Sequence, residues 1–175
     1  MLHNRQDAYR LLAELGAPQR LLTHVELVGE AGDRLIAEYI ELGLSFDARL
    51  IELGVAIHDA GKIVHPEELE GPGATHEPAG QTMLLARNVQ PEVARCCVAH
   101  AKWQESEVSF EERSVALADK LWKGKREEML ELAIIDAVAA KLQTGRWEVF
   151  ARLDAVFEEI ASGAEARLER SRSKD

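Results

Sequence analysis

Histidines and aspartates recur through the first two thirds of the chain in an order that is typical of a metal site. In chain order they are His24, the adjacent pair His58 and Asp59, His76, His100 and Asp119. Imidazole nitrogens and carboxylate oxygens are ligands of borderline and hard divalent cations. Most of these residues stand in apolar, helical surroundings, where a polar group without a partner is costly. The series therefore predicts a metal centre.

The two aspartates carry the strongest part of this prediction. Asp119 stands within the apolar run at residues 116–121. An ionised carboxylate in such surroundings needs a cation as its partner. His58 and Asp59 come at the end of an apolar segment predicted to be a helix. Side chains at a helix end can both reach one cluster, and a carboxylate there can bridge two ions.

The elements that would position these residues are all predicted to be helices, because apolar residues recur at helical spacing along nearly the whole chain. A short helix ends at Gly16, and a long one begins at Pro18 with Gly29 and Gly32 as a kink or break. Further helices are predicted at 48–60, 77–88, 91–102, 110–122, 126–142 and 147–161. Residues 61–75 are rich in Pro and Gly and are predicted to form a loop.

This pattern predicts an all-α fold, a single-domain helical bundle over residues 1–161. Residues 162–175 are charged and Ser-rich, which is typical of a flexible tail. At 175 residues the chain is long enough to bury one sizeable core without disulfides or structural metals. No internal repeat and no convincing strand is evident in the sequence.

Composition excludes several classes of partner. Lys and Arg number 21 against 31 Asp and Glu, and the net charge of −10 disfavours binding to long nucleic acids. No stretch approaches the roughly 18 apolar residues of a membrane span, and the first ten residues lack the apolar region of an export signal. Cys96 and Cys97 are adjacent, which makes them a poor disulfide pair. We therefore expect a cytoplasmic protein without a membrane partner.

The ordered residues resemble a known family. Their order is similar to the pattern of the HD-domain metal-dependent phosphohydrolase superfamily. The matching residues are His24, the pair His58-Asp59 followed by Ala60-Gly61-Lys62, and Asp119. The resemblance spans roughly residues 20–122 and implies a helical bundle of the HD type. It also implies that these two histidines and two aspartates are the ligands of a first metal ion.

The remaining residues of the series match the binuclear members of the family. His76 and His100 correspond to the two extra histidines of that subset, in which the middle aspartate, here Asp59, bridges both ions. Lys62 matches a lysine that lies close to this aspartate and to the phosphate of the substrate. The Gly-Tyr-Pro signature of the cyclic-dinucleotide esterases is missing, and Ala101 follows His100 where many relatives have a second histidine. We therefore do not expect a cyclic dinucleotide as substrate.

The expected function is a metal-dependent phosphohydrolase that cleaves a phosphoester or phosphoanhydride bond in a small, nucleotide-like substrate by a metal-activated hydroxide. Lys62 and Asp59 are the predicted catalytic residues. Two divalent ions, Fe or Mn, are the expected cofactors, and the ligand set also suits Co, Ni, Zn or Mg. His65, Lys102 and Lys123 are candidate substrate contacts, although a loop histidine and helix-surface lysines are more often simply solvated.

Two other functions fit the same residues. Some HD-type proteins with these ligand types use a di-iron pair to activate oxygen, here on a small organic or phosphonate substrate. A non-enzymatic binding module that keeps its metal for structure is the second alternative. Hydrolysis is the commoner chemistry among relatives, and a structural site has no need of an open coordination position or of Lys62.

Overall fold

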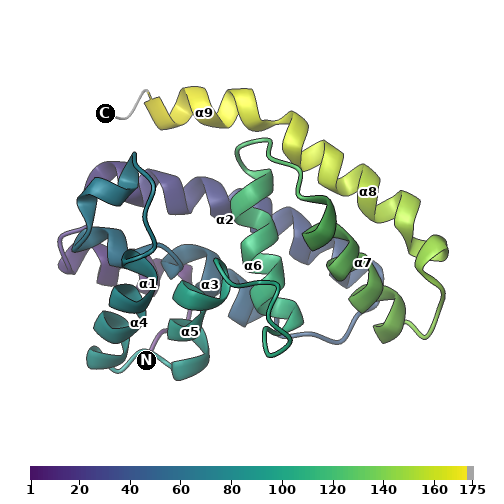
Figure 1. The fold of residues 1–175 in the computed structure, drawn as a ribbon, viewed down its shortest axis with the longest axis horizontal. Coiled ribbons are helices and arrows are strands. Elements are labelled where there is room, and N and C mark those ends of the chain that lie inside the picture. Colours follow the sequence, from purple (N-terminus) through teal and green to yellow (C-terminus); the bar gives the residue numbers. More distant parts are fainter. Residues whose placement is uncertain (173–175) are drawn as a thin grey trace.

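The computed structural model describes residues 1–172, and within that range it contains helices and no strand (Figure 1). This confirms the predicted all-α class. In chain order the elements are α1 (Arg5–Glu14), α2 (Gln19–Glu41), α3 (Ala48–Ile57), the short 3-10 helices η1 (Ala60–Ile63) and η2 (Pro66–Leu69), α4 (His76–Ala86), α5 (Pro91–Ala99), α6 (Phe110–Leu121), α7 (Glu128–Lys141), α8 (Arg146–Ser162) and α9 (Ala164–Arg172).

Helix α3 is the centre of the core. It packs against α1, α2, α5 and α6, and the side chains of Ile51, Leu53, Val55 and Ile57 are buried. The helix begins where the side chain of Asp47 accepts a hydrogen bond of 3.0 Å from the backbone N–H of Leu50. Its first half carries the exposed Arg49, but residues 53–57 are buried on all sides and apolar, and such a segment is stable only inside the molecule. Its C-terminal end, which carries the His-Asp pair, is therefore held in the interior.

Helix α2 differs from the expectation, because it continues without a break through Gly29 and Gly32. A Cβ added at Gly32 would lie 3.1 Å from a methyl of Val55, and one at Gly29 would lie 3.2 Å from the guanidinium of Arg5. Both glycines thus allow α3 and α1 to approach α2 closely. These two glycines therefore permit close packing between helices and do not interrupt α2.

The predicted loop at 61–75 contains the two 3-10 helices, and η1 lies directly against the start of α4. A Cβ on Gly61 would overlap the backbone carbonyl of His76 and lie 2.7 Å from the backbone nitrogen of Gly80. Only glycine fits between two backbones at this distance. Gly61 therefore sets the position of His76 relative to the His-Asp pair.

Helices α8 and α9 run along one edge of the molecule, and α4 and α5 lie at the opposite side (Figure 1). The charged composition predicted a flexible tail from residue 162, whereas the structure has helix α9 up to Arg172. The helix is anchored because Arg167 is buried and donates hydrogen bonds to the backbone carbonyls of Trp122, at 2.8 Å, and Leu121, at 3.3 Å. The end of the predicted tail, residues 173–175, lies outside the described residues. Within residues 1–172, every helix is too short or too polar to cross a membrane.

Candidate metal centre

The structure brings all six predicted metal ligands together in the interior. Five segments supply them: His24 comes from α2, His58 and Asp59 from the end of α3, His76 from the first turn of α4, His100 from the end of α5, and Asp119 from α6. The side chains of His58 and Asp59 are almost completely buried, and that of His24 is 16% exposed. Access to the cluster is therefore from the side of His24.

A first group of ligands surrounds one oxygen of Asp59. Its Oδ2 lies 2.9 Å from Nε2 of His24 and 3.6 Å from Nε2 of His58. Oδ1 of Asp119 lies 3.5 Å from the same nitrogen of His58. One donor atom from each of these four residues lies within 4.8 Å of the others. Two imidazoles and two carboxylates at this spacing can hold one divalent ion.

A second group surrounds the other oxygen of the same carboxylate. Oδ1 of Asp59 lies 3.1 Å from Nε2 of His76 and 3.7 Å from Nε2 of His100. Asp59 thus presents one oxygen to each group of ligands, which is the arrangement of a carboxylate that bridges two ions. The chain leaves the α-helix after Ile57, and Asp59 has φ −100° and ψ 14°, so neighbouring side chains can converge here.

Hydrogen bonds fix which nitrogen of each imidazole faces the centre. Nδ1 of His58 lies 3.0 Å from the carbonyl of Val55, and Nδ1 of His100 lies 3.1 Å from the carbonyl of Cys96. A carbonyl only accepts, so each Nδ1 carries the hydrogen and each Nε2 keeps its lone pair. Nδ1 of His76 contacts Glu68 in the same way. Partners of this kind orient the imidazole ligands of metal sites.

Several buried atoms at the centre lack a hydrogen-bond partner among the described residues. They are Nε2 of His24, His58 and His76, and Oδ1 of Asp59. A buried polar atom without a partner is costly, and such atoms are rare in native structures. These atoms converge on one another and all are metal-ligand types. The donor set therefore fits divalent metal ions.

Asp59 and His100 are in protonation states that suit metal binding, whereas nearby carboxylates outweigh burial and raise the pKa of His58 and His76. Burial alone would raise the pKa of Asp59, but the imidazoles of His58, His24 and His76 beside it outweigh this effect, so the pKa lies well below its usual range. Burial and the proximity of His58 lower the pKa of His100 to about 4. At neutral pH the centre therefore contains an ionised carboxylate and a neutral imidazole at His100, the forms that bind metals.

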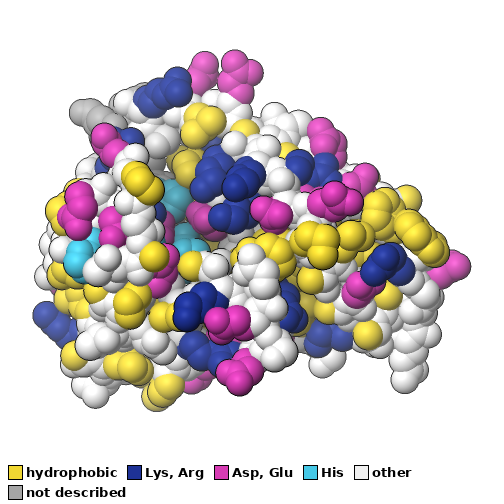
Figure 2. Space-filling model, in the orientation of Figure 1, with side chains coloured by type: hydrophobic (Ala, Val, Ile, Leu, Met, Phe, Trp, Pro, Cys, Tyr) yellow, Lys and Arg dark blue, Asp and Glu magenta, His cyan; other side chains and the backbone are white. Residues whose placement is uncertain are grey.

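A cavity of about 360 Å³ opens beside this centre. Figure 2 shows histidine side chains at the bottom of a hollow, with Lys and Arg side chains beside it. The lining residues are Arg20, His24, Lys62, Leu69, Trp122, Lys123, Leu168, Ser171 and Arg172. Nζ of Lys62 donates a hydrogen bond of 2.7 Å to Oδ2 of Asp59, and Nζ of Lys123 lies 3.9 Å from Oδ2 of Asp119. The space next to the ligands thus favours an anion.

The structure places only one of the three candidate substrate contacts in the cavity beside the metal ligands. Lys123 lines the cavity beside the metal ligands. Lys102 lies at a different cavity, next to Glu77, and pairs with Glu105 at 3.8 Å. His65 pairs with the exposed Glu67 at 3.2 Å and does not line the cavity that contains His24.

The sequence did not indicate some residues that the structure places at the site. Glu68 is buried and contacts His76, and Arg20 and Arg172 border the cavity. An imidazole that binds a metal through one nitrogen usually donates a hydrogen bond from the other, so an acidic residue is expected near His76. This expectation does not indicate which of the several glutamates before His76 accepts the hydrogen bond.

Comparison with known proteins places the chain in a family. The family model described as HD domain matches residues 7–124, which covers most of the chain and all six candidate ligands. The chain therefore belongs to the HD domain family, whose members are mostly metal-dependent hydrolases. Comparison with curated proteins and with solved structures gave no match.

Proposed function

We propose that this protein is a phosphohydrolase that uses two divalent metal ions, Fe or Mn, to cleave a phosphoester or phosphoanhydride bond in a small, nucleotide-like molecule. One observation carries the proposal: the two oxygens of Asp59 face separate groups of ligands, next to a cavity lined by lysine and arginine side chains. His24, His58, Asp59 and Asp119 would hold one ion, and Asp59, His76 and His100 the other.

When bound, two such ions lower the pKa of a water between them and neutralise charge on a phosphoryl oxygen. The protein itself would bind and orient the phosphate. Lys62 is 17% exposed and stands between Asp59 and the cavity, so its ammonium can contact a non-bridging oxygen as negative charge develops there. Lys123 stands beside Asp119 in the same lining and would hold a second oxygen. Their positions select a phosphate over a neutral group.

The partner implied by this site is a small phosphorylated molecule. The acidic chain, with net charge −10, does not suit a long nucleic acid, because an excess of negative charge opposes binding to a phosphate backbone. Cys96 and Cys97 are free and buried, which agrees with a reducing compartment, and we propose a cytoplasmic location.

The test compares the parent protein with Asp59→Ala. Both are purified, loaded with Mn or Fe, and assayed on bis(p-nitrophenyl) phosphate and on a panel of nucleotides, with and without oxygen. We expect oxygen-independent hydrolysis by the parent and none by the variant. Added metal should raise the melting temperature of the parent only, because a ligand stabilises the state that binds it. Asp136→Ala is the control, since this aspartate pairs with Arg146 at the surface.

Two results would contradict the proposal. Equal stabilisation of the parent and Asp59→Ala by metal would show that Asp59 does not hold the ions. A product that forms only in the presence of oxygen, without release of phosphate, would identify the protein as an oxygenase.

A further inference from the structure

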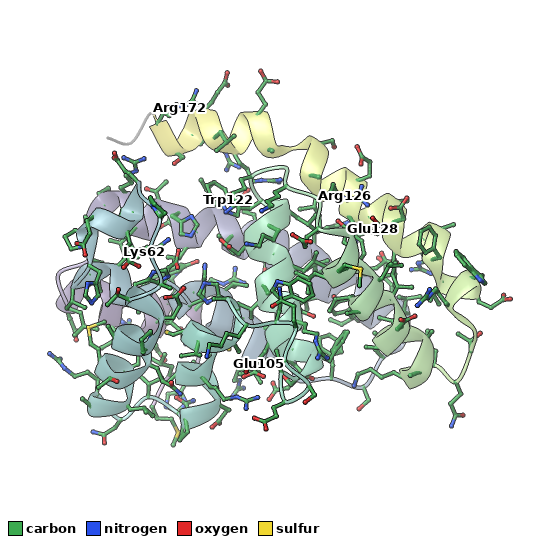
Figure 3. The ribbon with its side chains drawn as sticks, in the orientation of Figure 1. Lys62, Glu105, Trp122, Arg126, Glu128 and Arg172 are labelled. Carbon is green, nitrogen blue, oxygen red and sulfur yellow. The ribbon has the colours of Figure 1, made fainter. Side chains whose placement is uncertain are left out.

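Helix α9 forms the outer wall of the cavity beside the metal ligands. Leu168, Ser171 and Arg172 line this cavity, and their spacing of three and four residues places them on one face of the helix. Figure 3 shows Lys62, Trp122 and Arg172 on three different elements around this part of the molecule. Helix α9, which supplies no candidate metal ligand, thus contributes directly to the space where a substrate would bind.

Hydrogen bonds from Arg167 and Arg170 fix the position of α9. Arg167 is buried and donates to the carbonyls of Trp122 and Leu121 at the end of α6, and also to that of Ile160 in α8. Arg170 donates to both carboxylate oxygens of Glu30 in α2, each at 2.7 Å. These bonds hold the helix against the elements that carry His24 and Asp119. Arg172 is therefore presented from a supported helix.

The four Lys and Arg side chains that line the cavity differ in their ion-pair partners. Lys62 and Lys123 lie against the aspartates of the metal centre. Arg20, from α2, is paired with Glu70. Arg172, from α9, has no ion-pair or hydrogen-bond partner within residues 1–172. A guanidinium that borders an anion site without a partner is free to bind an oxyanion, which it does with two parallel hydrogen bonds.

The remaining lining is apolar. Leu69, Trp122 and Leu168 contribute carbon surface to the same cavity. Its volume, about 360 Å³, lies within the roughly 300 to 1,000 Å³ typical of small-molecule sites. A cavity with both cationic and apolar surface suits an organic phosphate better than an inorganic ion.

We propose that the cavity binds a substrate with two linked phosphoryl groups on an organic group, and that Arg172 binds the phosphoryl group farther from the metal ions. The reacting phosphoryl group lies beside Lys62 and Lys123, and the organic group contacts the apolar lining. This inference rests on the proposed function, since it assumes phosphate chemistry at the metal centre. It makes Arg172 a residue that determines specificity, without a part in the chemical step.

Two analogues that resist hydrolysis test this inference in the 175-residue protein loaded with Mn. Calorimetry measures the binding of methylenediphosphonate and of methylphosphonate to the parent and to Arg172→Gln. Because a diphosphonate can also chelate the ions, the ratio of the two dissociation constants is compared between the two proteins. We expect the variant to bind the diphosphonate about 10- to 100-fold more weakly, as loss of one charged hydrogen-bonding group can cause. Its affinity for the monophosphonate should stay within a factor of about 3 of the parent.

Arg10→Gln is the matched control, because it removes an exposed arginine on α1 that is paired with Asp7, outside the cavity. Arg172→Lys keeps the charge without the planar guanidinium and should recover part of the preference. An unchanged ratio in Arg172→Gln, or an equal change in Arg10→Gln, would overturn the inference. The hydrolysis assays are separate from these measurements. Hydrolysis with an unchanged ratio would refute only the role of Arg172, and a changed ratio without hydrolysis would refute only the proposed function.

Discussion

Oε2 of Glu68 lies 2.5 Å from Nδ1 of His76, and Nε2 of the same imidazole lies 3.1 Å from Oδ1 of Asp59. The imidazole therefore stands between two carboxylates, one in the metal centre and one behind it. Glu68 also accepts hydrogen bonds from the backbone N–H groups of Thr75 and His76, at 3.1 and 3.2 Å. It thereby caps the start of α4, where the side chain of Thr75 makes no capping bond. One glutamate orients both a candidate ligand and the helix that carries it.

Replacing Glu68 should weaken metal binding without removing any ligand. We expect Glu68→Gln to lower the affinity for the second ion by about 10- to 100-fold, as loss of such supporting partners does in other metal sites. Calorimetric titration with Mn measures the effect. Glu67→Gln is the control, because the side chain of this neighbour is exposed and pairs with His65 away from the metal ligands. Equal Mn affinities for both variants would show that Glu68 has no part in positioning His76.

The number of bound ions tests the division of the ligands into two groups. We expect two metal ions per chain in the Mn- or Fe-loaded parent, and one in His76→Ala or His100→Ala, because His24, His58, Asp59 and Asp119 are a sufficient set by themselves. Elemental analysis and anomalous scattering provide the count. A single ion in the parent, with His76 and His100 turned away from it, would reduce the site to a mononuclear one.

A substitution of Lys62 distinguishes an effect on metal binding from an effect on turnover. Lys62→Ala should keep its metal content and fold while turnover falls by about 10²- to 10³-fold, the usual effect of losing one group that stabilises transition-state charge. Lys102→Ala is the matched control, since Lys102 is exposed and lines a different cavity. Steady-state kinetics with parallel metal analysis distinguish the outcomes. If Lys62→Ala instead loses metal, the contact of Lys62 with Asp59 serves to hold the bridging carboxylate.

Gly61→Ala should destabilise the protein more than a glycine substitution in open space. The added methyl would overlap the His76 carbonyl, and backbone on both sides cannot move aside as a flexible side chain can. We expect a loss of about 1 to 3 kcal/mol in the free energy of unfolding, or more, together with weaker binding of the second ion. Gly145→Ala, where nothing lies within 4 Å of the new methyl, is the control. Urea unfolding of both variants measures the difference.

The ligand set could be predicted from sequence because its signal is local. His58 and Asp59 are neighbours at the end of an apolar helix, and Asp119 lies inside another, so the residue type and its surroundings already imply a cation. Glu68 could not be predicted in this way. It belongs to a short 3-10 segment that also contains Glu67 and is followed directly by Glu70, and no helical periodicity indicates which of these glutamates points inward.

The limits on predicting the fold have a similar origin. Glycine weakens an isolated helix, so Gly29 and Gly32 predict a kink or break, yet tight packing against α1 and α3 stabilises this helix. Residues 164–172 have the composition of a solvated tail. The helix there depends on hydrogen bonds from Arg167 to carbonyls of Leu121 and Trp122, which are distant in sequence. Tertiary contacts of this kind leave no periodic pattern in the segment itself.

All six candidate ligands lie between His24 and Asp119, whereas the outer wall of the cavity is built from Leu168, Ser171 and Arg172. The segment that would select the substrate is thus separate in the chain from the segment that would hold the metals. An exchange of residues 168, 171 and 172 leaves every ligand and the buried Arg167 in place. This face of α9 can therefore be randomised as a small library to alter which molecules bind, with the metal content of each variant as an internal check that the centre is intact.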